Sequence, residues 1–138
     1  MNCIFCKIAA GEIPCHKLAE DEHTLAFLDI MPISRGHLLV IPKQHVELAY
    51  LAAPALMGAL MSTAVRLGRA AQAALQCAGM NFLVNCGARA GQVVPHVHLH
   101  VVPRYADDEI HWPWPQCTLD KDAAAGLVTA IRERMAQG

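Results

Sequence analysis

The 138-residue chain lacks the features that mark export, a membrane anchor or a disordered tract. Its apolar runs are too short to cross a bilayer, which takes about 20 residues. The N-terminal stretch MNCIFCKIAAGEIP is broken by charges and a proline, so it does not resemble a signal peptide. No internal repeat, linker or low-complexity segment divides the chain. We therefore expect one soluble, cytoplasmic domain over residues 1–138, with no membrane partner.

Charge of either sign is also scarce. Charged residues make up 17% of the chain, and the formal net charge is −1 at pH 7. This balance gives no electrostatic reason to expect a nucleic-acid partner or a membrane surface. The apolar fraction of 54% is slightly above the usual range for soluble domains. Surplus apolar surface is often buried between subunits, which favours an oligomer.

Cysteines are present without an export signal: Cys3, Cys6, Cys15, Cys77, Cys86 and Cys117. An even number predicts a disulfide framework only in an oxidising compartment, so free thiols or metal ligands fit better. Cys3 and Cys6 form a CxxC pair. Taken alone, that pair fits a redox motif, half of a metal site or coincidence.

Hydrophobic periodicity predicts an α+β domain. Strands are expected at residues 17–20, 24–29, 37–41, 80–85 and 93–102, and helices at 5–10, 54–77 and from 118 or 120 to 135. The first two strands read as a hairpin, and the helix over 54–77 is amphipathic. This order predicts a mainly antiparallel five-stranded sheet with one long helix and a C-terminal helix.

Three histidines alternate with aliphatic residues in the last predicted strand: His96, His98 and His100. Alternation puts the imidazoles on one face, about 6.6 Å apart at neighbouring Cα atoms, and the aliphatic side chains on the other. The apolar face would pack on the core, and the imidazole face would form the floor of a cleft.

Three readings of this face compete. The first is that the histidines simply lie on a solvated strand face without a function. A lone histidine would favour this interpretation, but three histidines in strict alternation disfavour it. A single metal ion is disfavoured because the outer pair stands about 13 Å apart, whereas a Zn–N bond is about 2.0 Å. One central imidazole flanked by two others suits nucleophilic attack on phosphorus, since neutral imidazole is available near its pKa of about 6.5.

The segment is identified as the histidine-triad (HIT) signature, in which three histidines alternate with hydrophobic residues. Further stretches resemble this family in the same order: Ile4-Phe-Cys-Lys-Ile8, Gly11-Glu-Ile-Pro14, Ala26-Phe-Leu-Asp-Ile30, Gly36-His-Leu-Leu-Val-Ile-Pro-Lys43, His45, Val84-Asn85 and Gly91-Gln92. The resemblance covers roughly the first 105 residues. It implies the HIT-like fold, with a core over about residues 3–104 and a tail over 105–138.

For activity, the resemblance implies a hydrolase acting at the α-phosphate of purine nucleoside phosphoramidates or dinucleoside polyphosphates. His98 matches the family nucleophile and would carry a nucleoside-monophosphoryl group that water removes. His100 matches the histidine that stabilises the α-phosphate oxygens. The alternatives are a nucleotidyltransferase using the same intermediate and a nucleotide-binding regulatory protein. An aprataxin-like role on DNA is disfavoured, because the chain has neither room nor basic charge for the added DNA-binding module.

The resemblance also implies nucleotide-binding residues. Asp29 matches the acidic residue that holds the ribose hydroxyls, although a turn aspartate is the plain reading. The base pocket would comprise Phe5, Ile8, Leu28 and Ile30, and the phosphate side Asn85, Gly91, Gln92 and Val93. As isolated residues the apolar members would simply be assigned to the core. Val93 is a departure, because the family usually has Ser or Thr there and only the backbone N–H remains.

Two further expectations rest on the resemblance. Zinc-bearing relatives combine a CxxC pair with two histidines, which implies a structural Zn²⁺ on Cys3, Cys6, His45 and His96. Cys2His2 is a closed structural zinc set, and free thiols are the alternative. The strand over 80–85 and the preceding helix join two subunits in the family, which implies a homodimer. Trp112 and Trp114 either line the leaving-group side or pack the tail, and His37 either supports the triad or is a buried core histidine.

Overall fold

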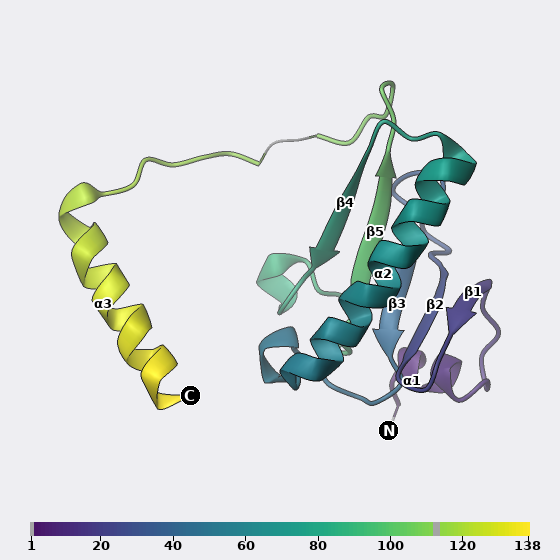
Figure 1. Ribbon diagram of the computed structural model, residues 1–138, viewed down its shortest axis with the longest axis horizontal. Coiled ribbons are helices and arrows are strands. Elements are labelled where there is room, and N and C mark those ends of the chain that lie inside the picture. Colours follow the sequence, from purple (N-terminus) through teal and green to yellow (C-terminus); the bar gives the residue numbers. More distant parts are fainter. Residues whose placement is uncertain (1, 112–113) are drawn as a thin grey trace.

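The computed structural model describes residues 2–111 and 114–138, so Trp112 lies outside the described residues. The chain forms an antiparallel five-stranded sheet in the order β1-β2-β3-β5-β4 (Figure 1). The strands are β1 (Lys17–Glu20), β2 (Thr24–Leu28), β3 (Leu38–Pro42), β4 (Gly79–Val84) and β5 (Leu99–Arg104). The helices are α1 (Ile4–Ala9), α2 (Pro54–Leu75) and α3 (Lys121–Gln137), with 3-10 turns η1 (Ala49–Leu51) and η2 (Ala88–Ala90). The predicted fold class is confirmed.

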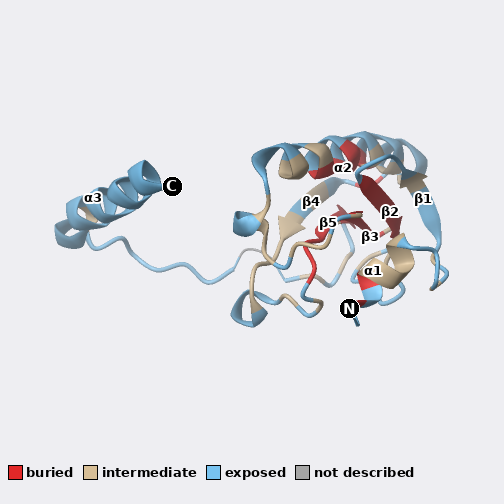
Figure 2. Cartoon of the chain, turned by 90° about the horizontal axis from the view of Figure 1, so that it is seen from below, coloured by how far each residue is buried: buried red, intermediate tan, exposed pale blue. Residues whose placement is uncertain are grey.

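Strand alternation divides the sheet into two apolar faces. One face packs under α2, where Leu60 and Ala64 meet Ala26, Val40 and Leu99, all fully buried. The other face meets α1 through a cluster of Phe5, Leu25, Phe27, Leu39 and Ile41. Seen along the sheet, α2 and α1 lie on opposite sides of the buried strands (Figure 2). The core therefore lies mainly between the sheet and α2, and α1 covers part of the reverse face.

The last strand begins later than predicted. β5 starts at Leu99 rather than at residue 93, so His96 and His98 precede it. The amide of His96 donates to the carbonyl of Val94 at 2.8 Å, which closes a tight turn over Pro95. Proline has no N–H for the ladder, and this turn interrupts the extended backbone. The predicted alternation nevertheless persists, because Val97, Leu99 and Val101 all lie in the cluster under α2.

The tail ends in α3, close to its predicted limits. The Asp120 carboxylate accepts hydrogen bonds from the backbone amides of Asp122 and Ala123, which caps the helix N-terminus. No residue of α3 is buried, and the helix stands apart from the sheet (Figure 1). Among the described residues, no helix is both long and apolar enough to cross a membrane.

Candidate active site and metal centre

His98 is held as the tautomer that a nucleophile needs. Its Nδ1 lies 2.7 Å from the backbone carbonyl of His96. A carbonyl oxygen can only accept, so Nδ1 carries the proton and donates. In the neutral ring Nε2 is then unprotonated and keeps its lone pair. The residue is buried, which restricts the imidazole to this orientation.

A relay through His37 sets the opposite tautomer at His100. The amide of Ile33 donates to His37 Nδ1 at 3.2 Å, so the proton of that ring is on Nε2. His37 Nε2 donates to His100 Nδ1 at 2.9 Å, which leaves His100 with its proton on Nε2. That Nε2 is buried and has no hydrogen-bond partner in the described structure. A buried N–H without an acceptor is costly, so this donor is suited to an oxygen of a bound ligand.

Both members of the relay are neutral near pH 7. Burial, followed by the nearby His98 and His37, lowers the pKa of His100 to about 4, against the opposing effect of Asp29. Burial also lowers the pKa of His37, against the opposing effect of Asp29. Neutral rings can hold the hydrogen bonds from Ile33 to His37 and from His37 to His100, because each ring has one unprotonated nitrogen that accepts. A second proton on either ring would remove that acceptor.

Aromatic rings lie beside the imidazole of His98. The rings of His98 and His100 have centroids 4.8 Å apart, and Phe5 meets His98 edge-on at 5.1 Å. Phe27, in β2, packs against Phe5 with 5.8 Å between the ring centroids. The sequence interpretation did not select Phe27. Alternation in β2 could have identified it, because Phe27 shares the α1 side of the sheet with Phe5.

The other predicted base-pocket residues lie in different surroundings. Ile8 packs against the Phe5 cluster. Leu28 packs against the cluster under α2, which is the opposite face of the sheet. Ile30 lies in the β2–β3 loop and is 81% exposed. The structure thus brings Phe5 and Ile8 together and leaves Leu28 and Ile30 apart from them.

Asp29 stands at the end of β2, next to the relay. Its Oδ1 accepts from the amide of Met31 at 2.8 Å, and its Oδ2 lies 3.7 Å from His37 Nε2. One carboxylate oxygen is therefore occupied by the turn, which agrees with the alternative prediction that Asp29 is a turn aspartate. The Oδ2 side faces the histidine relay and has acceptor capacity left for a ligand hydroxyl.

The loop on the predicted phosphate side depends on glycine and on Gln92. Gly91 has a φ of 90°, a left-handed conformation that favours glycine. A Cβ at this position would lie 3.5 Å from the side-chain Nδ2 of Asn85. Gln92 accepts from the amide of Gly87 at 2.7 Å and donates to the carbonyls of Glu47 and Val94. Its side chain therefore ties three segments together. Val93 is 90% exposed beside it.

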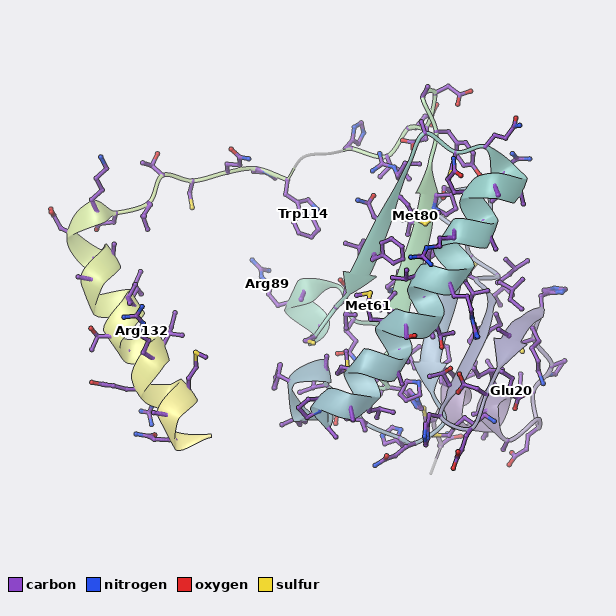
Figure 3. The ribbon with its side chains drawn as sticks, in the orientation of Figure 1. Glu20, Met61, Met80, Arg89, Trp114 and Arg132 are labelled. Carbon is purple, nitrogen blue, oxygen red and sulfur yellow. The ribbon has the colours of Figure 1, made fainter. Side chains whose placement is uncertain are left out.

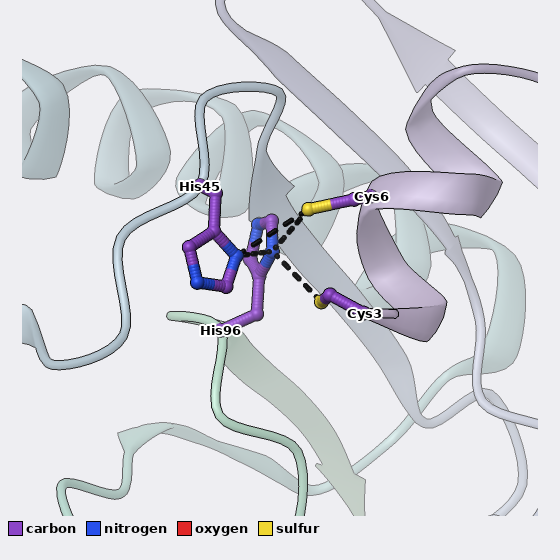
Figure 4. A group of neighbouring side chains, drawn as sticks. All are labelled: Cys3, Cys6, His45 and His96. Atoms are coloured by element: carbon purple, nitrogen blue, oxygen red, sulfur yellow. Dashed lines mark hydrogen bonds between the residues drawn. The ribbon is translucent and has the colours of Figure 1, made fainter. Parts of the chain in front are cut away.

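The predicted zinc ligands converge on one point from three segments (Figure 4). Cys3 Sγ lies 3.4 Å from His96 Nδ1, and Cys6 Sγ lies 3.3 Å from His45 Nδ1. The two histidine Nδ1 atoms are 3.2 Å apart, and the four donor atoms all lie within 4.8 Å of one another. Cys3 and Cys6 come from the N-terminal segment, His45 from the loop after β3, and His96 from the turn before β5.

This cluster fits a tetrahedral zinc ion. With Zn–S bonds of about 2.3 Å and Zn–N bonds of about 2.0 Å, neighbouring ligand atoms stand about 3.3–3.8 Å apart. His96 Nε2 donates to the carbonyl of Pro42 at 2.8 Å, which leaves Nδ1 unprotonated toward the cluster. The same residue offers its backbone carbonyl to His98. These four side chains could therefore hold a metal ion beside the candidate nucleophile.

Known proteins resemble this chain over most of its length. The HIT domain model matches residues 10–107. Protein hit of Bacillus subtilis is 48% identical over 104 residues, which are 75% of this chain and 72% of that protein. Adenylylsulfatase HINT3 of Arabidopsis thaliana is 39% identical, covering 97% of this chain and 70% of the relative. Adenosine 5'-monophosphoramidase hnt1 of Schizosaccharomyces pombe is 41% identical, covering 82% and 84%.

Solved structures agree with the fold. A Streptococcus mutans UA159 protein superimposes with a TM-score of 0.92 at 41% identity, covering 98% of this chain and 87% of that one. A HIT family protein from Bacillus subtilis superimposes with a TM-score of 0.90 at 39% sequence identity, and the match covers 97% of both chains. A zinc-bound histidine triad family protein from Mycobacterium smegmatis superimposes with a TM-score of 0.76 at 34% sequence identity. The match covers 100% of this chain and 99% of that one. With the family model matched over residues 10–107, the sequence identities and the shared fold, the chain belongs to the histidine-triad (HIT) domain family.

Proposed function

We propose that the protein hydrolyses purine nucleoside phosphoramidates or dinucleoside polyphosphates at the α-phosphate. The observation that carries this proposal is the pairing of two opposite tautomers on adjacent histidines. His98 presents an unprotonated Nε2, and His100, 4.8 Å away between ring centroids, presents an unpaired buried Nε2–H. A nucleophile beside a donor for phosphoryl oxygens is the minimum that this reaction requires.

The proposed reaction has two displacements at phosphorus. In the first, His98 Nε2 forms a bond to the α-phosphorus and the bond to the leaving group breaks. The leaving group departs with its electron pair, either as a nucleoside polyphosphate or as an amine that takes up a proton from solvent. His100 Nε2–H donates to the oxygens on which charge accumulates. In the second, water attacks the same phosphorus and gives up a proton to solvent, the N–P bond breaks with its electron pair returning to His98 Nε2, and a nucleoside monophosphate leaves.

The site also supports a nucleotide as substrate. Phe5 contacts His98 edge-on and packs on Phe27, which makes this side of the site apolar, as a base requires, and Asp29 has an acceptor oxygen for the ribose. Two relatives are named for reactions on adenosine nucleotides, a phosphoramidase and an adenylylsulfatase. The adenine part of the proposed substrate rests on those relatives.

Zinc is proposed as a structural ion on Cys3, Cys6, His45 and His96. When bound it would supply a fixed link among three chain segments. His96 would then orient His98 only through its backbone carbonyl, because its ring is committed at both nitrogens. The solved zinc-bound relative supports the choice of metal.

A substrate panel tests the proposed function. Purified protein is assayed with adenosine phosphoramidate, diadenosine tri- and tetraphosphate, adenylyl sulfate and the matching guanosine phosphoramidate, with and without added inorganic phosphate. We expect AMP release from the phosphoramidate or a dinucleotide, abolished in His98→Ala. Capture of the nucleotidyl group by phosphate would indicate a transferase. Binding without turnover on every member would contradict the proposal and favour a regulatory protein.

A further inference from the structure

The two sulfurs of the candidate zinc cluster differ in their access to solvent. Cys3 is 7% exposed, whereas Cys6 is only half-buried, and both are free cysteines. Their Sγ atoms lie within 4.8 Å of each other, in the group drawn in Figure 4. A small reagent in solution therefore reaches Cys6 first and finds a second sulfur next to it.

Metal binding would keep both sulfurs in a reactive form. Cysteine binds zinc as the thiolate, which is also the form that attacks a disulfide. Cys6 Sγ lies 3.3 Å from His45 Nδ1 and 3.6 Å from His96 Nδ1, so it stands among the other donor atoms. The cluster would thus hold two adjacent thiolates, of which one is accessible. This step rests on the zinc site proposed above.

The positions of the two cysteines permit a disulfide only if the first turn of α1 tightens. The Cys3 carbonyl accepts from the amide of Lys7 at 3.1 Å, so Cys3 and Cys6 flank that turn. Side chains three residues apart on a helix have Cβ atoms about 5–6 Å apart, whereas a disulfide holds them about 3.5–4.5 Å apart. Oxidation therefore draws the turn in by about 1–2 Å.

Phe5 connects this turn to the candidate nucleophile. Its ring is buried and meets the ring of His98 edge-on, with 5.1 Å between the centroids. It also lies 5.8 Å from the ring centroids of His96 and Phe27. Within α1, all of which the structure describes, Phe5 is the one buried residue. A change in the turn is therefore transmitted to the ring that packs beside His98.

From these contacts we infer that Cys6 is a site of thiol oxidation, at which a low-molecular-weight disulfide such as oxidised glutathione converts the zinc-binding pair into a Cys3–Cys6 disulfide. The Cys6 thiolate attacks one sulfur of the reagent, a mixed disulfide forms, and one thiolate of the reagent leaves. The Cys3 thiolate then attacks Cys6 Sγ, the mixed disulfide breaks, and the second thiolate leaves. The cysteine pair loses two electrons, and the reagent gains them.

This modification would inactivate the protein reversibly. Once both sulfurs are joined, the two remaining histidines no longer make a closed site, and the metal leaves as Zn²⁺. The N-terminal segment then loses its link to His45 and His96, and Phe5 shifts against His98. A thiol reductant together with zinc would restore the original state. Turnover would therefore depend on the redox state of the surrounding thiol pool.

Zinc release and disulfide mapping test this site. Protein carrying one equivalent of zinc is incubated with oxidised glutathione, the released metal is measured with a chromogenic chelator, and disulfides are mapped by mass spectrometry of non-reduced digests. We expect zinc release to match formation of the Cys3–Cys6 disulfide, and hydrogen exchange in residues 2–10 to rise. AMP release should fall by about tenfold or more, since a small misplacement near the reacting atoms is costly. Dithiothreitol with zinc should reverse these changes.

Two cysteines outside the pair serve as matched controls. Cys15 is half-buried and packs on the same apolar cluster as the pair. Cys117 is exposed in the tail, which stands apart from the body, as the separation of Arg132 from Met61 and Met80 shows (Figure 3). Cys15→Ser and Cys117→Ser should both release zinc at the rate of the natural chain, with the same disulfide formed.

Several results would overturn the inference. One is a disulfide that joins Cys6 to Cys15, and another is zinc that stays bound while Cys117 is oxidised. A third is a Cys3–Cys6 disulfide that leaves hydrogen exchange in α1 unchanged. Protein that takes up no zinc would overturn both the metal site and this inference. Absence of nucleotide turnover would contradict the proposed function alone, because metal release, disulfide mapping and hydrogen exchange are measured without substrate.

Discussion

The chemistry depends on which ring nitrogen of each histidine carries the proton. The carbonyl of His96 fixes the proton of His98 on Nδ1, and the relay from Ile33 through His37 fixes that of His100 on Nε2. Neither assignment requires a charged imidazole. In the proposed mechanism these hydrogen bonds prepare the two rings for different tasks, attack by His98 and donation by His100.

Substitution should separate these two tasks. His98→Ala removes the attacking atom, so kcat should fall on the order of 10⁴-fold or more while the fold and nucleotide binding persist. His100→Ala removes one donor and should cost about 10²–10³-fold. His16→Ala, at an exposed position, is the matched control and should leave kcat unchanged. Steady-state kinetics with a nucleotide-binding titration measures all three; equal losses for His98→Ala and His100→Ala would oppose the assigned roles.

Acid should destabilise the protein through the relay. Burial lowers the pKa of His100 to about 4 and also lowers that of His37, whereas the unfolded rings titrate near 6.5. The unfolded chain therefore binds more protons below pH 6.5. The stability from His100 is present above that pH and is lost as the pH falls toward 4, on the order of 3 kcal/mol.

Urea unfolding between pH 7 and pH 4 measures this dependence. The free energy of unfolding should fall with pH in the natural chain, and the slope should be shallower in His100→Gln, which cannot titrate. A slope unchanged by this substitution would mean that His100 is not the group responsible.

At this scale the sequence indicated the residue types better than their surroundings. Alternation correctly predicted that the histidines and aliphatic residues separate onto two faces, and the CxxC pair does lie beside His45 and His96. The relay through His37 and the contact of Phe27 with Phe5 depend on pairing between strands distant in sequence. Leu28 illustrates the limit, because its side is decided by the register of β2.

Of the elements around the candidate site, α1 has little attachment of its own. α1 is six residues long and contributes one buried residue, Phe5, to the reverse face of the sheet. The link through Cys3 and Cys6 to the turn before β5 would hold this helix in place when zinc is bound. Since Phe5 also touches the ring of His98, loosening α1 should disturb the site indirectly.

Loss of zinc should therefore act first on stability. Cys6→Ser or chelation should lower the melting temperature by at least about 5 °C, with activity falling only as a consequence. Cys117→Ser, at an exposed cysteine of the tail, should change nothing. Calorimetry and metal analysis by mass spectrometry are the measurements. Less than about half an equivalent of zinc in protein purified without chelators, with an unchanged melting temperature in Cys6→Ser, would return both cysteines to free thiols.

Helix α2 covers one face of the sheet through the buried side chains of Leu60 and Ala64. Leu60 is fully buried against the sheet, and truncation to alanine leaves a cavity costing about 2–5 kcal/mol. Leu51→Ala removes the same group from an exposed position and should cost less than about 1 kcal/mol. Denaturant unfolding compares the two. A small effect of Leu60→Ala would mean that α2 packs less tightly on the sheet than described.

Element boundaries were predictable where they rest on local signals. Pro54 begins α2, and Asp120 caps α3, as proline and aspartate favour at helix starts. The start of β5 was not predictable from local signals, because strand pairing, rather than hydrophobicity, defines where a strand begins. β3 pairs with β5 only from Leu99 onward, and the turn over Pro95 precedes it.

At the scale of the whole molecule, the sheet separates three tasks. Its α2 face supplies the main core, its reverse face carries His98, His100 and the candidate zinc ligands, and β4 forms one of its edges. The predicted homodimer would use this edge without covering the reverse face of the same subunit. Assembly and chemistry would then be separable by substitution, the first in β4 and the second at His98.

The central claim is that His98 Nε2 forms a covalent bond to the α-phosphorus, and rapid acid-free denaturation during turnover tests it most directly. Protein mixed with adenosine phosphoramidate is quenched in alkaline denaturant, which preserves phosphoramidate bonds, then digested and examined by mass spectrometry. The account predicts an adenylyl group on the peptide that contains His98, absent from His98→Ala. An unmodified His98 peptide under turnover, together with substantial activity in His98→Ala, would contradict it.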